Sequence, residues 1–269
     1  MNSIINFYRN HISWRPNYYH SKWKIFRLLS NYDQFYAGEQ YNYNFRVGYN
    51  ISVIDGLSAK HIFSEIFINE CYPIKKSNKK RLIIDIGANV GFFTFCALIK
   101  SPNMDIISIE ADPKNYDVLK NNISANNLED RVQLLNNAVC SKKGEIIFHS
   151  SLKNSGWSSL YKTRGAVESE SINICAITVS EILSTFKVNT VDILKIDIEG
   201  AEYDVLLNDS FLEFYEVKKL FIEVDLNPRD KRFSLEQLLK YLEKYYFDIQ
   251  IINPLDSYQL LICQGYKNK

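Results

Sequence analysis

From residue 82 to the end of the chain, short apolar runs alternate with longer segments whose apolar residues recur every three or four positions. Runs that are apolar on both faces are typical of parallel strands covered on both sides, and the longer spacing is that of helices. We therefore predict strands at 82–86, 105–110, 132–135, 144–149, 172–177, 191–196 and 220–225. Helices are predicted at 92–99, 113–126, 179–186, 202–207 and 234–244. This alternation predicts an α/β fold built on an open, mostly parallel sheet, closed by an antiparallel pair at 246–252 and 258–263.

The loop at residues 87–91 reads Gly-Ala-Asn-Val-Gly and joins the first of these strands to the first of these helices. Glycines let the backbone approach a ligand closely, and the N–H groups at a helix start point toward an anion. The candidate binding residues of this loop are Gly87, Ala88, Asn89 and Gly91. The loop predicts a site for a nucleotide-type cofactor, against the plainer alternative of a turn that binds nothing.

Two acidic residues near this loop indicate which cofactor it would take. A dinucleotide loop usually reads G-x-G-x-x-G, and here the third glycine is missing. Asp85, two residues before Gly87, would repel a pyrophosphate but would suit an ammonium and a sulfonium. Glu110 ends the next strand, the place from which ribose hydroxyls are held in doubly wound folds. S-adenosylmethionine carries both cationic groups and one carboxylate, so the charges favour it over NAD.

Acidic residues also end the later strands. Ligands of open α/β sheets bind beyond the carboxyl ends of the strands. The acids at or just past those ends are Asp85, Glu110, Asp197, Glu199, Glu223 and Asp225. We therefore predict that they converge on one acidic crevice. Lys195 lies on the same face of its strand as Asp197 and should neutralise part of the cluster, because a lysine in a buried strand needs a carboxylate partner.

At three stretches the chain resembles the FkbM family of S-adenosylmethionine-dependent methyltransferases. These are residues 85–91, residues 110–113 and, most specifically, residues 194–202, which read Leu-Lys-Ile-Asp-Ile-Glu-Gly-Ala-Glu. The resemblance covers roughly residues 80 to 230. It implies a Rossmann-like methyltransferase fold, with a seven-stranded, mostly parallel sheet whose last strand is antiparallel. Members resemble O-methyltransferases that act on hydroxyls of polyketides or bacterial surface glycans.

The resemblance also implies roles for individual residues. Asp85, Gly87, Asn89 and Glu110 would hold the cofactor, with Ala88 and Gly91 in the same loop. Asn137 and Ala138 would lie near the adenine, and Asp197 beside the methyl group. The catalytic candidates are Asp197, Glu223, Glu199 and Lys195. Several members carry His where this chain has Asp225, so no role of that His is carried over.

The implied reaction is attack of an acceptor hydroxyl on the sulfonium methyl, which needs in-line alignment and a base for the hydroxyl proton. Two mechanisms are open at the acid cluster. Carboxylates could bind a divalent cation (Mg²⁺, Ca²⁺ or Mn²⁺) that acts as a Lewis acid, or one carboxylate could itself be the base. Partial neutralisation by Lys195 and the lack of a nearby His favour the metal-free mechanism, so no metal ligand is assigned.

Residues 1 to about 40 differ in character from the rest, and we assign residues 1–75 as an appendage, a possible substrate lid, to a cofactor-binding domain at 76–269. Five Lys and Arg residues precede the first acid and are interleaved with aromatic side chains. The segment is expected to be either a helical appendage docked on the core or a lid over the substrate, or to touch an anionic membrane surface. A helix is predicted at 18–30, and either a strand or a hairpin broken at Gly48 is predicted at 41–55.

Two further segments carry predictions. Ser58 is expected to cap a helix that runs to about residue 69, followed by a charged, solvated linker. The polar stretch at 150–170, which contains Trp157, is either an acceptor-binding loop or a floppy insertion.

Composition narrows the class of protein. The net charge of +1 over 269 residues gives no global field that would favour nucleic acid. No apolar run approaches the length of a transmembrane helix, and the N-terminus lacks the apolar centre of a signal peptide. Five scattered cysteines without a C-x-x-C pair are expected to be reduced thiols, which indicates a cytoplasmic protein.

These observations predict an S-adenosylmethionine-dependent O-methyltransferase acting on a hydroxyl of a small molecule or of a surface-glycan sugar, lipid-linked acceptors included. The alternatives are a NAD-linked oxidoreductase and a module that binds the cofactor without catalysis. The sequence does not indicate an oligomeric state.

Overall fold

The computed structural model describes residues 24–31, 41–151, 158–160, 169–225, 228, 230–252 and 258–267. Most of the basic N-terminal stretch and the centre of the polar loop, including Trp157, lie outside the described residues. Of the helix predicted at 18–30, residues 24–30 are described: 24–28 are helical, whereas Leu29 forms a β-bridge with Phe45 and residue 30 lies in a turn.

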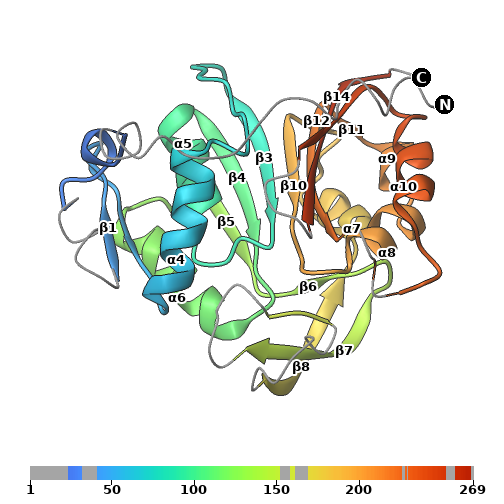
Figure 1. Cartoon of the computed structure of the whole chain (residues 1–269), viewed down its shortest axis with the longest axis horizontal. Helices are drawn as coiled ribbons and strands as arrows, with labels where there is room; N and C mark the ends of the chain where they lie inside the picture. The colour runs from blue at the N-terminus through green and yellow to red at the C-terminus, as the bar shows by residue number, and fades with distance from the viewer. Residues whose placement is uncertain are drawn as a thin grey trace.

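A seven-stranded sheet forms the centre of the described chain (Figure 1). Six strands run in one direction, and β14 is antiparallel to both of its neighbours, so the predicted antiparallel strand is confirmed. In spatial order the strands are β13 (Tyr246–Ile252), β14 (Tyr258–Tyr266), β12 (Lys219–Asp225), β10 (Ile193–Ile196), β3 (Arg81–Ile86), β4 (Met104–Ile109) and β5 (Val132–Leu135).

Helices cover both faces of this sheet, as the apolar runs predict. Neighbouring residues of one strand enter different cores, because successive side chains point to opposite faces: Ile83 belongs to one apolar cluster and Ile84 to the other. On the Ile83 face lie α5 (Phe92–Lys100) and α6 (Pro113–Ala125). On the Ile84 face lie α7 (Val179–Thr185), α8 (Glu202–Asn208), α9 (Phe211–Phe214) and α10 (Leu235–Leu242).

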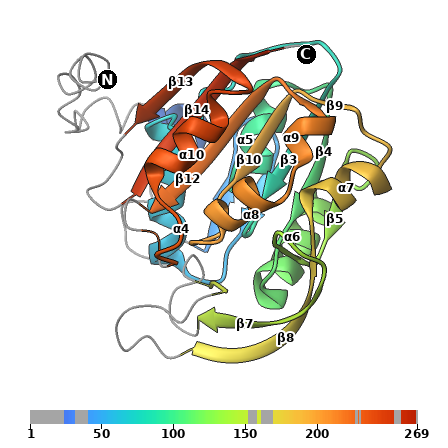
Figure 2. The same cartoon turned by 90° about the vertical axis from the view of Figure 1, so that its right-hand side faces the viewer.

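Three smaller sheets flank the central one. The largest contains β6 (Ala138–Val139), β7 (Gly144–Ser151) and β8 (Ser169–Ile177), and Figure 2 shows its long strands projecting beside the carboxyl ends of the central strands. The others are the hairpin of β1 (Asn42–Asn44) with β2 (Asn50–Ser52), and the short pair β9 (Thr190–Val191) with β11 (Glu216–Val217). The strand predicted at 191–196 is therefore divided between β9 and β10.

The helix predicted to start at Ser58 begins earlier, so that cap assignment is wrong. Asp55 is the N-cap of α4 (Gly56–Phe63), and its carboxylate accepts the N–H groups of Leu57 and Ser58. A carboxylate and a Ser hydroxyl can both accept the unpaired N–H groups of the first helical turn. The carboxylate is also negatively charged, so it complements the positive end of the helix dipole. The helix continues directly as the π-helical turn η1 (Ser64–Ile68) and ends where predicted.

The described part of the N-terminal segment packs into the same core as the sheet. Tyr43 lies 5.0 Å, centroid to centroid, from both Phe63 and Phe92. Ile25 and Leu29 are buried in the same cluster. As a result α4 and η1 are held firmly beside α5, close to the carboxyl ends of the strands.

Two observations bear on the class of protein. All five cysteines are free thiols in the structure. Within the described ranges, no helix has both the length and the apolar character needed to cross a bilayer.

Candidate active site

A cavity of about 550 Å³ opens beyond the carboxyl ends of β3, β4, β10 and β12. Its walls come from the glycine loop, from the segment after β10, and from α4 and η1. The predicted site residues in its lining are Gly87, Ala88, Asn89, Glu110, Asn137, Ala138, Lys195, Asp197, Glu199 and Glu223. The topology thus brings most of the predicted set into one cavity.

Gly87 is required by the close approach of two strand ends. Its φ is +78°, and a Cβ at this position would lie 1.7 Å from the carbonyl oxygen of Asp197. The N–H groups of Gly87 and Ala88 both donate to the carbonyl of Ile109, at 3.0 and 2.9 Å. The loop is therefore fixed between β4 and β10, and these two amides are already used within the protein.

Gly91 has a backbone role and does not line the cavity. Its φ is +105° at the N-cap of α5, where a Cβ would meet the side chain of Leu119 at 2.9 Å. Asn89 also has a positive φ, +51°, and its side-chain oxygen accepts the N–H of Val90. The two residues shape the turn that leads into the helix.

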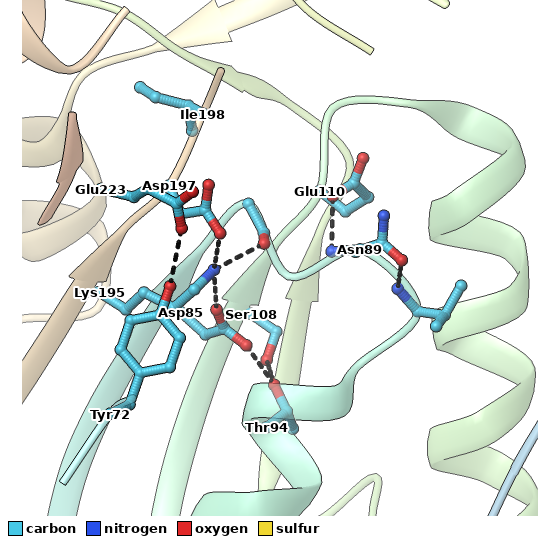
Figure 3. A network of polar contacts seen from close by, with 12 residues as sticks. Tyr72, Asp85, Asn89, Thr94, Ser108, Glu110, Lys195, Asp197, Ile198 and Glu223 are labelled. Atoms are coloured by element: carbon cyan, nitrogen blue, oxygen red, sulfur yellow. Dashed lines mark hydrogen bonds and ion pairs between the residues drawn. The ribbon is translucent and has the colours of Figure 1, made fainter. Parts of the chain in front are cut away.

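Glu110 faces the cavity at the end of β4 and is 6% exposed. Its carboxylate accepts the N–H of Asn89 at 2.7 Å (Figure 3). It also accepts the N–H of Asp112 at 2.9 Å. Burial raises the pKa of Glu110 to about 7, although these two hydrogen bonds act in the opposite direction. The carboxylate is fixed in direction, and its remaining lone pairs are available for hydroxyl donors.

Lys195 is the centre of a buried network of charges. Its Nζ lies 3.3 Å from Asp85 Oδ1 and 3.2 Å from Asp197 Oδ2, and it donates to the carbonyl of Gly87 at 2.9 Å (Figure 3). Burial alone would lower the pKa of Lys195, but Asp197 and Asp85 raise it above its ordinary value. Lys195 is therefore paired with carboxylates, as predicted.

Asp85 occupies a different position from the one expected. Its side chain is wholly buried beneath the cavity floor and does not line the cavity. Its other oxygen accepts the hydroxyl of Thr94 at 2.7 Å, and Thr94 in turn contacts Ser108. Asp85 lies level with Lys195 in the register of β3 and β10, so its carboxylate reaches the lysine and not the space above it.

Glu223, at the end of β12, lies on the other side of Asp197. Tyr72 donates a hydrogen bond to Glu223 Oε2 at 3.3 Å. Burial raises the pKa of Glu223 well above its ordinary value, and the carboxylates of Asp197 and Glu199 raise it further. Both effects favour the protonated form of Glu223.

Glu199 and Glu202, the two glutamates that follow Asp197, have different positions and contacts. Glu199 lines the cavity with a φ of +56°, and its carbonyl accepts the hydroxyl of Ser159. Glu202 does not line the cavity. It is buried, and its carboxylate accepts the N–H groups of Ile198 and Gly200, which closes the loop on itself.

Other candidates are placed as follows. Asn137 and Ala138 line the cavity beside β6, and the Asn137 amide donates to the carbonyl of Cys175. Asp225 does not line it. Ser158 lines it and donates to Asp112 at 2.7 Å, so the described end of the polar loop borders the site.

The cavity wall also contains Tyr72, His61 and Glu65, which the sequence did not indicate as site residues. His61 Nδ1 and Glu65 Oε2 are 3.4 Å apart, one helical turn from each other. The i, i+4 spacing of an acid and a base was a readable signal for a shared helix face, although nothing in it indicates a cavity. Among the residues that the structure describes, no three His, Cys, Asp or Glu side chains are grouped so that they could hold a metal ion.

The sequence profile of the family described as "Methyltransferase FkbM domain" matches residues 85–249, more than half of the chain. The chain belongs to the FkbM methyltransferase family. The matched range of this FkbM domain begins at Asp85 and contains the network around Lys195 as well as Glu110 and Glu223. The wall formed by α4, η1 and Tyr72 lies before it.

Two proteins named as methyltransferases are among the relatives of this FkbM domain. Methyltransferase sdnD of Sordaria araneosa is 26% identical over 214 residues, which cover 70% of this chain and 82% of that protein. Methyltransferase 1 of Beauveria bassiana (strain ARSEF 2860) is 26% identical over 167 residues, 56% of this chain and 67% of the relative. Among solved structures, M. capricolum TrmK in complex with S-adenosyl-homocysteine superposes with a TM-score of 0.40 at 13% identity, over 69% of this chain and 62% of that chain.

Proposed function

We propose that this protein is an S-adenosylmethionine-dependent O-methyltransferase, whose acceptor is a hydroxyl of a small molecule or of a surface-glycan sugar. The observation that carries the proposal is the single cavity with Glu110 on one side and the Asp197–Glu223 pair on the other. Membership of a methyltransferase family supports the transfer of a methyl group.

The residues present fit this cofactor. A volume of about 550 Å³ lies within the usual range for cofactor sites. Glu110 is suited to accept the two ribose hydroxyls, and the acidic floor suits an ammonium and a sulfonium. A dinucleotide fits less well, because the N–H groups of Gly87 and Ala88 already donate to Ile109 and cannot bind a pyrophosphate. Lys195, which lines the cavity, is neutralised by two aspartates.

When bound, S-adenosylmethionine supplies an electrophilic methyl group. The remaining tasks belong to the chain: aligning the acceptor oxygen, excluding water and accepting the hydroxyl proton. Glu223 is the proposed base, since its pKa is raised by burial and by neighbouring carboxylates. A cation entering the site lowers the pKa of a nearby carboxyl, so Glu223 is expected to release its own proton as the site fills. Tyr72 orients the carboxylate through its hydroxyl.

The acceptor would enter from the side of α4 and η1. These elements belong to the first 75 residues, and their side chains line the cavity. We therefore propose that this segment serves the acceptor. Lipid-linked sugars are included in the proposed class of acceptors.

Mass spectrometry after incubation with methyl-labelled cofactor and a panel of hydroxylated small molecules, glycans and lipid-linked sugars tests the activity. Asp197→Asn and Glu223→Gln should each reduce turnover at least about a hundredfold while circular dichroism stays unchanged. Asp225→Asn, a neighbouring acid outside the cavity, is the matched control and should retain activity. EDTA should leave the rate nearly unchanged. Activity lost to EDTA and restored by Mg²⁺ or Mn²⁺ would replace the proposed base with a metal-assisted mechanism.

A further inference from the structure

The proposed cofactor ends in an amino acid, and the carboxylate of that end needs a partner in the cavity. At neutral pH this end carries both an ammonium and a carboxylate. The floor of the cavity is acidic around Asp197 and Glu199, which suits the ammonium and the sulfonium but repels the carboxylate. A donor of N–H groups, best a charged one, is therefore needed elsewhere in the wall.

The glycine loop, from which the sequence predicts anion binding, has no N–H group left for this purpose. The N–H groups of residues 87–91 all donate within the protein, at 2.7 to 3.0 Å. Their acceptors are the carbonyls of Ile109 and Ala88 and the side chains of Glu110 and Asn89. The first three residues of α5 are at most 2% exposed, so their amides have almost no surface to offer a ligand.

Two basic side chains stand among the described lining residues, Lys195 and His61. Lys195 is paired with two aspartates, so its charge is already used (Figure 3). His61 has one partner, Glu65, whose Oε2 lies 3.4 Å from Nδ1. In the part of the chain that the structure describes, the other ring nitrogen, Nε2, has no partner.

Glu65 follows His61 by one helical turn and determines the state of its ring. A carboxylate that faces Nδ1 requires a proton on that nitrogen. The hydrogen bond with Glu65 raises the pKa of His61, against a smaller opposite effect of burial. The favoured form is the imidazolium, which has a second N–H, at Nε2, with which to bind an anion.

Packing holds His61 beside the end of the glycine loop. The rings of Phe63 and Phe67 stand 6.2 and 6.3 Å from the ring of Phe92, the first residue of α5, and Phe92 lines the cavity together with His61. The side chain of His61 is 60% exposed, whereas that of Lys195 is 4% exposed. His61 therefore lies at the open side of the cavity and Lys195 at its floor.

On the proposed function, we infer that His61 binds the carboxylate at the amino-acid end of the cofactor through its Nε2–H, and that Glu65 is the positioning residue that orients the ring. The acids of the floor then face the sulfonium and the ammonium, and the imidazolium at the rim faces the carboxylate. His61 and Glu65 precede the matched range of the FkbM domain. The N-terminal appendage thus serves the cofactor as well as the acceptor.

Calorimetry at pH 7 with three ligands tests this inference without an acceptor. S-adenosylhomocysteine has the whole amino-acid end, its decarboxylated analogue keeps the ammonium alone, and 5′-methylthioadenosine has neither group. The acidic floor by itself would favour the decarboxylated analogue, which has no negative charge. The wild-type protein should instead bind S-adenosylhomocysteine on the order of tenfold more tightly, because the analogue loses a charge-assisted hydrogen bond.

His61→Gln removes the cation and should lower the ratio of these two affinities at least about threefold, without changing the affinity for 5′-methylthioadenosine. Glu65→Gln should lower the same ratio, because the ring loses its orienting partner. His61→Arg keeps a cation and should retain a higher ratio than His61→Gln. The matched control is His149→Gln, a histidine of β7 outside the cavity, which should leave the ratio unchanged.

Equal or tighter binding of the decarboxylated analogue to the wild-type protein would overturn the inference, and so would a ratio unaffected by His61→Gln. A His61→Gln variant that weakens all three ligands equally would overturn it as well, since the loss would then be structural. A ratio no higher in His61→Arg than in His61→Gln would remove the role of the charge. Failure of S-adenosylhomocysteine to bind the wild-type protein would instead overturn the proposed function, and the inference with it.

Discussion

Replacing Lys195 by Met should destabilise the fold more than any other single lysine substitution in the described sheet. The change keeps most of the apolar stem and removes the ammonium, which is within 3.3 Å of Asp85 and Asp197 and donates to Gly87. Asp85 has no exposed surface, so water cannot replace the lost partner. Removing one partner of a buried ion pair costs about 3–5 kcal/mol.

Urea unfolding at pH 7 measures this cost directly. At roughly 2–4 °C per kcal/mol for a chain of this size, the melting temperature should also fall by roughly 6–20 °C. Lys218→Met is the matched control, because Lys218 pairs with Asp192 at 3.0 Å but is half exposed. An exposed pair of this kind contributes less than about 1 kcal/mol.

A double-mutant cycle tests whether the stability lost in Lys195→Met comes from leaving the Asp85 carboxylate unpaired. Adding Asp85→Asn to Lys195→Met removes the stranded charge, so the double variant should be more stable than the sum of the two single effects predicts. Strictly additive effects, or a cost for Lys195→Met no greater than that for Lys218→Met, would refute the account of a buried network.

Three further predictions concern the loops around the cavity. Gly87→Ala forces a Cβ to 1.7 Å from the Asp197 carbonyl and adds the cost of a positive φ, so it should destabilise by more than about 1–3 kcal/mol in thermal unfolding and abolish cofactor binding. Glu202→Ala leaves the N–H groups of the loop after β10 without their acceptor and should cost at least about 2 kcal/mol by urea unfolding. Because the pKa of Glu110 is raised to about 7 and the ionised form accepts ribose hydroxyls, affinity for S-adenosylhomocysteine should rise about tenfold from pH 6 to pH 8 in calorimetry.

Each of these has a control. Gly48→Ala has a φ of +101° but open space around the new Cβ, so it isolates the backbone cost from the clash. Glu213→Ala removes an exposed acid and should be nearly neutral. Glu110→Gln should flatten the pH dependence. A Gly87→Ala variant no less stable than Gly48→Ala, or an affinity independent of pH in the wild-type protein, would contradict the assignments.

The central fold was predictable because strands buried on both faces leave an unambiguous apolar signature. The runs around Ile84 and Ile222 could only be core strands, and their carboxyl ends had to share one edge. Asp197 and Glu223 accordingly meet at the cavity as expected.

The register of neighbouring strands and the direction of individual side chains could not be predicted from the sequence. Asp85 was assigned to the cofactor because it precedes the glycine loop, yet its level in the sheet places it opposite Lys195, beneath the floor. Glu202 ends the most specific stretch of the family resemblance, 194–202, yet its side chain turns back to N–H groups of its own loop. Tyr72 lies before the alternating strands and helices, so its place in the cavity could not be predicted from the positions of strand ends.

Titration calorimetry with S-adenosylhomocysteine tests the central claim most directly, using the wild-type protein and Glu110→Ala at pH 8. The account predicts one binding site per chain in the wild-type protein and an affinity roughly ten- to a hundredfold lower in the variant, since one charge-assisted contact is lost. NAD should give no measurable heat in either protein. Absence of binding to the wild-type protein, or an affinity unchanged by Glu110→Ala, would contradict it.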